Sequence, residues 1–203
     1  MSTTNNYRTL QRPSEAHLFK DKGSKFIGYA YPVEDENRIA ELLVQVKAQH
    51  PKANHCCYAW RLGHDSSARY RVNDDGEPKN SAGQPIYGQL LSKELTNTLV
   101  MVVRYFGGTK LGVGGLINAY KSCAEGTLAR ASILTKEIQV ALQLTFAYQD
   151  INKVMRIVKG QNLQLKSQKM ELDCEFVVAV NADEFDSVFQ LFQSHSGIEV
   201  QKI

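Results

Sequence analysis

The amino-acid sequence predicts an α+β protein with two domains, formed by residues 1–135 and 136–203. The second segment alternates the hydrophobic periods of strands and helices in a regular order. The first contains strand and helix patterns of its own, separated by a long irregular loop and a glycine-rich segment. At 203 residues, the chain also exceeds the ~100–150 residues of a typical domain.

Composition excludes several classes of protein. With 43% hydrophobic and 22% charged residues, the chain is not a disordered polymer. No apolar stretch approaches the ~20 residues that span a bilayer, and the polar start lacks a signal-peptide core. We therefore expect a cytoplasmic protein with no membrane partner. Four cysteines without a C-x-x-C pair indicate reduced thiols rather than a disulfide framework.

The net charge of +3 divides unevenly along the chain. Residues 1–135 hold 17 Lys and Arg against 12 Asp and Glu, a net charge of +5. The remaining residues hold 7 against 9, a net charge of −2. This difference in sign indicates that the two parts have different roles, and it favours an anionic partner for the first.

The first domain has a less regular order of elements. Hydrophobic patterning predicts strands at residues 26–31, 55–62 and 69–72, and a continuous apolar run predicts a central strand at 99–103. Helical spacing predicts helices over residues 36–49, near 84–92 and over 116–131. The segment 73–85 is rich in Asp, Gly, Asn and Pro, so we predict a loop there.

A glycine-rich segment at residues 104–116 follows the predicted central strand and precedes a helix. Glycines let backbone amides turn toward a ligand, and a helix N-terminus adds free N–H groups and a positive dipole. We therefore predict an anion site, for a small-molecule phosphate or a nucleic-acid backbone. Alternatively, the glycines only permit a tight turn, since neither G-x-x-x-x-G-K-[ST] nor G-x-G-x-x-G is present. The residues of the predicted site are Arg61, Arg104, Gly107, Gly108, Lys110, Gly112, Gly114, Gly115 and Lys121.

The loop at 73–85 carries Asp74, Asp75 and Glu77, which we place beside the anion site. Three carboxylates could bind a hard cation such as magnesium, but their spacing does not match an EF-hand. A solvated acidic loop is the favoured interpretation.

Histidine and cysteine residues suggest a second possible centre. His55 and Cys57 share one face of a predicted strand, and with Cys123 they could form a metal site or a Cys–His nucleophile pair. A complete set of four ligands is missing, so core thiols and an edge histidine are favoured. We predict no metal and no cofactor, and we assign no catalytic residue.

Aromatic residues lie among the arginines of the first domain. Tyr58 and Trp60 alternate with Arg61, and such residues could stack bases on a basic sheet together with Arg69, Arg71 and Arg104. The more common arrangement buries these aromatics in the core.

The second domain is the more regular one. Apolar residues at every second position predict strands at residues 137–146 and 172–180. We also predict shorter extended segments near Leu163 and at 198–200. Helical spacing predicts helices at 149–160 and after Asn181, which is placed as an N-cap with Glu184 in the capping-box position. The order β-α-β-β-α-β is that of a ferredoxin-like split βαβ domain.

Several strings in the first domain resemble the IMPACT family, specifically its bacterial YigZ-like branch. They are KGSKFIG (22–28), HCCYAWR (55–61), DDGEP (74–78), SAGQP (81–85) and VVRYFGGTKLGVGGLINAY (102–120). The resemblance implies a first domain similar to the second domain of the fifth small-subunit ribosomal protein and to domain IV of elongation factor G. It implies a second domain similar to the ferredoxin-like domain V of that factor.

The resemblance also implies a function. Eukaryotic relatives look like translational regulators that bind the activator of the general-control kinase through an additional N-terminal domain. Only about 20 residues precede the first motif here, so we expect that domain to be absent. What remains is an expected association with RNA, the ribosome or translation factors.

The sequence leaves three functional hypotheses open. The preferred one is an RNA- or ribosome-associated protein whose basic glycine-rich segment contacts phosphates. The second is a small-molecule, kinase-like enzyme in which the same segment holds a phosphate and Asp74 or Asp75 holds magnesium. The third is an adaptor that binds a basic protein partner through its acidic C-terminal domain.

Overall fold

The computed structural model of the protein describes residues 5–64 and 68–203. The chain divides into two compact units. The larger comprises Tyr7–Lys136, and the smaller comprises Glu137–Ile203 with the described residues before Tyr7. Within the described residues, no helix is both long and apolar enough to cross a membrane.

The larger unit is built on a five-stranded antiparallel sheet with the strand order β2-β3-β6-β4-β5. Its strands are β2 (His17–Asp21), β3 (Ser24–Pro32), β4 (His55–Leu62), β5 (Arg69–Asn73) and β6 (Thr98–Tyr105). A separate two-stranded sheet pairs β1 (Asn6–Leu10) with β7 (Ile133–Glu137). The predicted strands are present, whereas the sequence does not predict β1, β2 and β7, because they are short and lack a continuous hydrophobic pattern.

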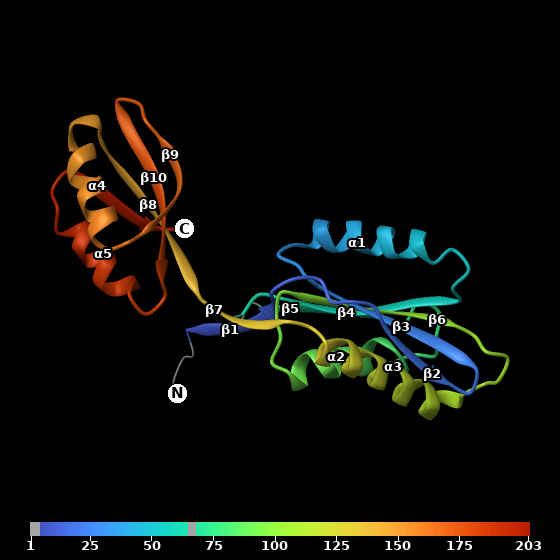
Figure 1. The fold of residues 1–203 in the computed structure, drawn as a ribbon. Helices are drawn as coiled ribbons and strands as arrows, with labels where there is room; N and C mark the ends of the chain where they lie inside the picture. The colour runs from blue at the N-terminus through green and yellow to red at the C-terminus, as the bar shows by residue number, and fades with distance from the viewer. Residues whose placement is uncertain (1–4, 65–67) are drawn as a thin grey trace. The chain divides into compact units, whose positions relative to one another are not determined.

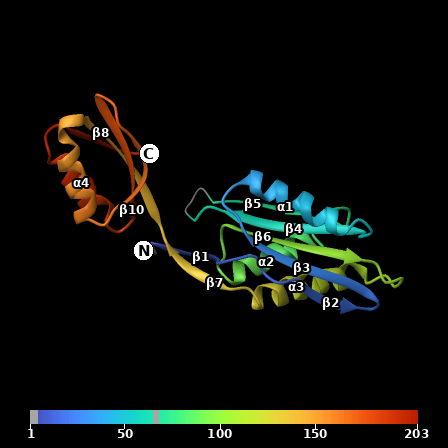
Figure 2. The same cartoon turned by 45° about the horizontal axis from the view of Figure 1, so that its top comes forward.

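Helices cover both faces of the five-stranded sheet (Figures 1 and 2). Helix α1 (Glu36–Gln49) lies on one face, and α2 (Gly83–Ser92) and α3 (Gly112–Ala129) lie on the other. Each face has its own hydrophobic core, because neighbouring residues of a strand point to opposite sides. On β4, Cys56, Tyr58 and Trp60 pack toward α1, while Cys57 and Ala59 pack toward α2 and α3.

Strand β6 confirms the central strand predicted from the continuous apolar run. Its residues from Leu99 to Val103 are all fully buried, because helices cover the sheet on both faces and strands flank β6 on both edges. Such a strand does not alternate in hydrophobicity. Tyr58 and Trp60 are also buried, so they belong to the core and are not a base-stacking surface.

The smaller unit has the order β8 (Gln139–Ala147), α4 (Ile151–Gly160), β9 (Gln164–Lys169), β10 (Asp173–Asn181), α5 (Phe185–Gln193) and β11 (Ile198–Lys202), with a short 3-10 turn, η1 (Tyr148–Asp150), before α4. Its sheet has the spatial order β11-β8-β10-β9, and all neighbours are antiparallel. Apolar faces of both helices pack on one side of this sheet. The unit is therefore ferredoxin-like, and the predicted α+β fold class is confirmed.

One local prediction in this unit is wrong. Asn181 does not cap α5, because it is the last residue of β10, and the helix begins four residues later at Phe185. Glu184 occupies the N-cap position and makes no side-chain cap hydrogen bond. The strand pairing of Asn181 with Gln139 continues the ladder to this residue, so tertiary pairing overrides the local capping signal.

We expect Gly28→Ala in β3 to lower the free energy of unfolding by about 1–3 kcal/mol. A Cβ at this position would overlap the Thr127 Oγ1 atom of α3, and Thr127 is fully buried, so overpacking cannot be relieved at the surface. The matched control is Gly88→Ala in α2, where no described atom lies within 4 Å of the added Cβ. That change should stabilise the helix by up to about 1 kcal/mol. Urea denaturation of both variants measures the difference, and equal stabilities would contradict the packing argument.

Candidate anion-binding site at one end of the sheet

Segments that are distant in sequence meet at one end of the larger unit's sheet. They are the turn between β2 and β3, the start of β4, the loop between β5 and α2, and the loop between β6 and α3 (Figure 1). Within the sheet, Phe26, Arg104 and His55 are neighbours in register on three adjacent strands. All three lie on the face that α2 and α3 cover, because they alternate with residues of the α1 core.

A buried ion pair joins the acidic loop to the sheet. The Arg104 Nη1 atom donates to the Glu77 Oε1 atom at 2.7 Å, and the two side chains are only 7% and 4% exposed. The hydroxyl of Tyr120, from α3, donates to the same carboxylate oxygen at 2.8 Å. Cys57 Sγ lies 3.3 Å from that hydroxyl, so a strand, a loop and a helix meet in one hydrogen-bonded cluster.

Arg104 also links this cluster to the glycine-rich segment. Its guanidinium lies 5.5 Å from the ring centroid of Phe26 and 5.6 Å from that of Phe106. Its Nη2 atom is 3.5 Å from the Ser24 Oγ atom, which also accepts from the Gly107 backbone N–H at 3.2 Å. The buried Nε of Arg104 has no hydrogen-bond partner among the described residues.

The Asp74 carboxylate organises the second half of the acidic loop. It accepts hydrogen bonds from the backbone N–H groups of Asn80, Ala82 and Gly83 at 2.8–3.0 Å. The last two groups lie at the start of α2, where backbone N–H groups have no partner within the helix. Asp74 therefore stabilises the N-terminus of α2.

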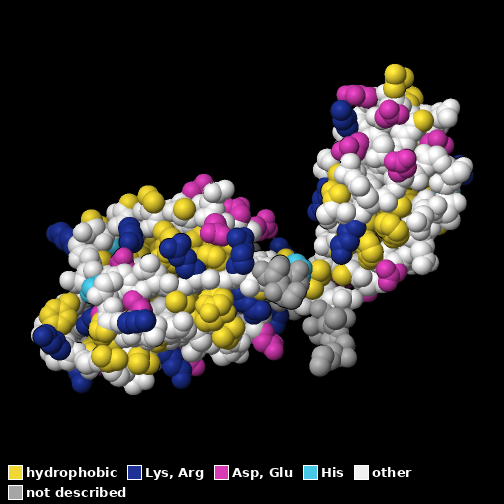
Figure 3. All heavy atoms as spheres, turned by 180° about the vertical axis from the view of Figure 1, so that it is seen from behind, with side chains coloured by type: hydrophobic (Ala, Val, Ile, Leu, Met, Phe, Trp, Pro, Cys, Tyr) yellow, Lys and Arg dark blue, Asp and Glu magenta, His cyan; other side chains and the backbone are white. Residues whose placement is uncertain are grey.

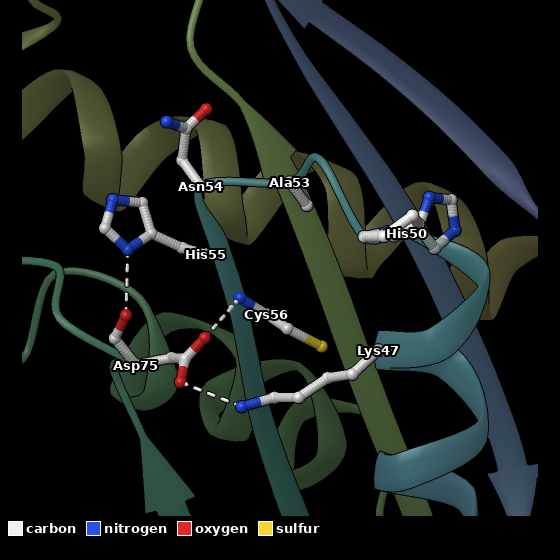
Figure 4. A pocket seen from close by; sticks show the side chains of 8 residues that line it. Lys47, His50, Ala53, Asn54, His55, Cys56 and Asp75 are labelled. Atoms are coloured by element: carbon white, nitrogen blue, oxygen red, sulfur yellow. Dashed lines mark hydrogen bonds and ion pairs between the residues drawn. The ribbon is translucent and has the colours of Figure 1, made fainter.

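The Asp75 carboxylate binds the neighbouring strand and helix (Figure 4). Its Oδ2 atom accepts from the Cys56 backbone N–H at 2.7 Å, and its Oδ1 atom forms an ion pair with Lys47 Nζ at 3.1 Å. The hydrogen bond to Asp75 raises the pKa of Lys47. The backbone carbonyl of Asp75 lies 2.8 Å from His55 Nδ1. A carbonyl can only accept, so Nδ1 carries the proton and Nε2 of a neutral His55 is an acceptor, 3.9 Å from Glu77 Oε1.

The acidic loop is therefore not the solvated cluster that the sequence favoured. Asp74, Asp75 and Glu77 are each bound to protein donors, and Glu77 is buried. No group of three or more His, Cys, Asp or Glu residues suited to a metal ion is found in the part of the chain that the structure describes. Magnesium at these carboxylates would have to displace backbone and arginine donors.

A small cavity of about 250 Å³ lies between the C-terminal end of α1 and the start of β4 (Figure 4). Lys47, His50, Asn54 and Asp75 are among its lining residues. His50 bridges two tyrosines: its Nε2 atom lies 2.7 Å from the Tyr29 hydroxyl, and its Nδ1 atom lies 2.8 Å from that of Tyr105. Burial lowers the pKa of His50, so the neutral ring is favoured.

The cysteines are buried thiols. Burial raises the pKa of Cys56 to about 11 and that of Cys123 to about 12, and it raises the pKa of Cys57 further. A nucleophilic or metal-binding cysteine requires the thiolate, which burial disfavours. The structure therefore supports the interpretation of these residues as core thiols.

The glycine-rich segment contains two kinds of glycine. Gly107 is required for packing, because a Cβ there would overlap the backbone carbonyl carbon of Gly23. In contrast, Gly108, Gly112 and Gly114 have no described atom within 4 Å of an added Cβ, and the first two have φ angles of +86° and +73°. A Cβ on Gly115 would contact only Leu111 closely, at 3.1 Å. Close packing thus accounts for Gly107, and positive φ angles account for Gly108 and Gly112. Gly114 meets neither requirement, and like Gly108 and Gly112 it borders open space at the start of α3.

The N-terminus of α3 has no side-chain cap among the described residues. Its first-turn N–H groups therefore lack helix-internal partners, and the positive end of the helix dipole is exposed there. Lys110 is exposed in the preceding loop, and Lys121 is exposed on the same helix face as Gly114, Ile117 and Asn118. These features form an electropositive surface.

Arg61 lies elsewhere. It faces α2 at the far end of β4, six residues and about 20 Å along the strand from His55. Arg104 is near the glycine-rich segment but buried beneath it. Of the four predicted cationic residues, Lys110 is exposed in the glycine-rich segment, and Lys121 is exposed about 14 Å farther along α3.

Three lysines outside the predicted site lie beside it. Lys20 and Lys25 are paired across the β2–β3 hairpin, and Lys22 lies in its turn, next to Gly23. All three are exposed. The close backbone approach of Gly23 and Gly107 places this hairpin turn against the glycine-rich segment. The sequence alone does not indicate this neighbourhood, because the two glycines are distant along the chain.

The family model of the Impact N-terminal domain matches residues 22–128, which include every segment of this end of the sheet. The chain belongs to the IMPACT family. The family predicted from the sequence strings is confirmed. The protein is 32% identical to IMPACT family member YvyE of Bacillus subtilis, over 88% of this chain and 81% of the relative. It is 39% identical to IMPACT family member YigZ of Escherichia coli, over 49% of each chain.

A solved structure shares the fold. The crystal structure of a hypothetical protein aligns with 98% of this chain and 97% of its own, with a TM-score of 0.79 and 25% sequence identity. The mixed helix and strand architecture of this IMPACT protein is therefore shared along nearly the whole chain.

We expect Glu77→Gln to destabilise the protein by about 3–5 kcal/mol, because it leaves the buried charge of Arg104 without a counter-charge. Adding Arg104→Met should recover much of this loss, since it removes the unpaired charge. Urea denaturation of the two single variants and the double variant measures the coupling. The control is Glu41→Gln, which breaks the exposed Arg38–Glu41 pair and should cost less than about 1 kcal/mol. Additive effects of Glu77→Gln and Arg104→Met would contradict the pair's role.

We also expect acid to destabilise the protein through His50. Its folded pKa is lowered by burial, whereas the unfolded chain binds a proton near the ordinary pKa of about 6.5. The unfolded state therefore takes up more protons as the pH falls through this value, and the free energy of unfolding decreases. Denaturation curves between about pH 7 and pH 5 should show this slope, and His50→Gln should reduce it. A residual slope is expected from His17, whose pKa is lowered by burial and by Arg130. An unchanged slope in His50→Gln would refute the assignment.

Proposed function

We propose that this IMPACT protein binds RNA, in association with the ribosome or translation factors. The proposed contact surface is the glycine loop, defined as residues 106–111, together with the first turn of α3 and the β2–β3 turn. The observation that carries the proposal is the uncapped N-terminus of α3 behind glycines that border open space. Phosphate groups bind favourably at such a helix N-terminus.

Charge supports the same ligand class. Lys110 contributes a cation from the glycine loop, and Lys22 contributes one from the adjoining hairpin turn. Lys20 and Lys25 lie on the face of the sheet that α1 covers, because they alternate with Phe19 and Phe26. Asp21 in the same hairpin offsets one of these charges. Two flexible lysines beside an exposed helix N-terminus suit a polyanion, which presents successive phosphates.

Arg104 has a different role in this proposal from the one expected. Because Glu77 pairs with it below the surface, its charge is largely compensated and it does not reach out to a phosphate. It acts instead through Ser24, whose hydroxyl oxygen joins the guanidinium to the Gly107 N–H. Arg104 would thus hold the glycine loop in a binding conformation.

The association with translation rests on family membership. The eukaryotic relatives that the sequence resembles look like translational regulators, and RNA and ribosomes are the anionic partners available to such proteins in the cytoplasm. The recognised chemistry would be the phosphate backbone, because the proposed surface presents backbone N–H groups and lysines.

We expect the variants Lys110→Ala and Lys22→Ala each to weaken RNA binding and to lower the salt dependence of the binding constant by about 0.7–0.9 in log–log slope. Fluorescence anisotropy with labelled RNA at several salt concentrations measures both quantities. Lys136→Ala is the control, because this exposed lysine lies on β7, away from the glycine loop (Figure 1). The proposal fails if wild-type protein shows no RNA binding at low salt, or if all three variants bind equally.

A further inference from the structure

The end of the sheet opposite the glycine loop carries an exposed aromatic pair. Tyr70 of β5 stacks on Tyr87 of α2, with ring centroids 4.4 Å apart and planes inclined by 15°. Tyr70 is 55% exposed, whereas Tyr87 is partly buried by α2 and the sheet. Since Tyr87 covers one face of the Tyr70 ring, the exposed half of this side chain includes the opposite face.

Tyr87 fixes the orientation of this exposed ring. It packs against the main core of the larger unit, and its position on a helix restricts its rotamers. A rigid aromatic ring binds a flat ligand at a low cost in conformational entropy, because only a few torsions need to be ordered. The pair therefore forms a preorganised flat platform, which we call the tyrosine platform.

An arginine side chain lies beside the tyrosine platform. Arg61 of β4 is the direct cross-strand neighbour of Tyr70 and shares its face of the sheet. Burial raises the pKa of Tyr87, and the charge of Arg61 acts in the opposite direction. Arg71 is exposed on the same strand as Tyr70, on the other face of the sheet. Lys and Arg side chains also lie near hydrophobic ones on the face of the larger unit seen in Figure 3.

Strand β5 adds hydrogen-bonding groups. It is the last strand in the order β2-β3-β6-β4-β5, so the backbone groups on its outer side have no strand partner among the described residues. An exposed aromatic face, an arginine next to it and free backbone donors and acceptors are the features on which single-stranded nucleic acids bind. A double helix would not fit, because its bases are already stacked on one another.

We propose that the tyrosine platform is a base-stacking subsite for single-stranded RNA, with a base on Tyr70 and the adjoining phosphate on Arg61. This inference rests on the proposed RNA-binding function, but the subsite reads a different part of the nucleotide. It lies about 20 Å along β4 from His55, whose cross-strand neighbour Arg104 precedes the glycine loop. The glycine loop binds phosphates only, whereas the tyrosine platform requires a base. The platform thereby makes unpaired RNA the preferred ligand.

The test compares a short single-stranded oligouridylate with an abasic oligonucleotide of the same length and backbone. Tyr70→Ala should weaken binding of the oligouridylate by roughly 5- to 150-fold, the range expected for one aromatic–base stack. It should leave binding of the abasic strand unchanged, because that strand has no base to stack. Tyr70→Phe keeps the ring and should stay within about twofold of the wild type on both strands.

Two control variants separate this subsite from general effects and from the glycine loop, and a third variant tests its phosphate contact. Tyr148→Ala removes a tyrosine of similar exposure, 59%, from the smaller unit and should change neither affinity. Lys110→Ala should weaken both strands alike, because it removes a phosphate contact. Arg61→Ala should lower the salt slope by about 0.7 on both strands. Thermal melting of each variant checks that it is folded.

The outcomes are distinguishable. If Tyr70→Ala binds oligouridylate as tightly as the wild type while Lys110→Ala is weakened, the tyrosine platform is not a base subsite and the proposed function stands. Equal wild-type affinity for the oligouridylate and the abasic strand also overturns the subsite. If Tyr70→Ala loses affinity for the oligouridylate and Lys110→Ala does not, the subsite is supported and the glycine loop is not the RNA contact. No binding of either strand at low salt refutes both proposals.

Discussion

The ion pair between Glu77 and Arg104 is the interaction on which this end of the molecule depends. A buried guanidinium is costly to desolvate, and it is tolerated only with a counter-charge and further hydrogen bonds. Glu77 is that counter-charge, and it can reach Arg104 only if the loop between β5 and α2 crosses the end of the sheet. The hydroxyl of Tyr120 completes the carboxylate's hydrogen bonds and ties α3 to the same point. One ion pair therefore determines the relative positions of a strand, a loop and a helix.

The other acidic residues follow from this position of the loop. Once Glu77 is anchored, Asp74 lies at the N-terminus of α2 and Asp75 lies against β4 and Lys47. Each carboxylate replaces lost hydration with backbone N–H donors or a cation, which is the condition for partial burial. The loop that looked like an exposed acidic segment is thus a structural connection. The Ser24 hydroxyl oxygen accepts from both the Arg104 guanidinium and the Gly107 N–H, so the glycine loop is connected to the same hydrogen-bonded cluster.

Much of the fold was predictable because its signals are local. The apolar run of β6, the amphipathic pattern of α1 and the regular alternation in the smaller unit all reflect burial on one or two faces, and periodicity reports burial directly. The short strands β1, β2 and β7 carry no such signal, since they are partly exposed, and β1 and β7 also pair with each other across most of the larger unit's sequence. The capping signal at Asn181 was misleading, because cross-strand pairing with Gln139 outweighed a single side-chain hydrogen bond.

The sequence by itself determined the α+β class, the ferredoxin-like order of the smaller unit, the family, and the presence of an unusual glycine-rich turn before a helix. These properties depend on neighbours in sequence or on motif strings. Only the tertiary structure shows which charged side chains are exposed to a ligand. Arg104 is buried with Glu77, and Arg61 lies beside Tyr70. The contact between Gly23 and Gly107 places Lys22 next to the glycine loop. Charge, burial and distance between remote segments are set by packing, and no local pattern encodes them.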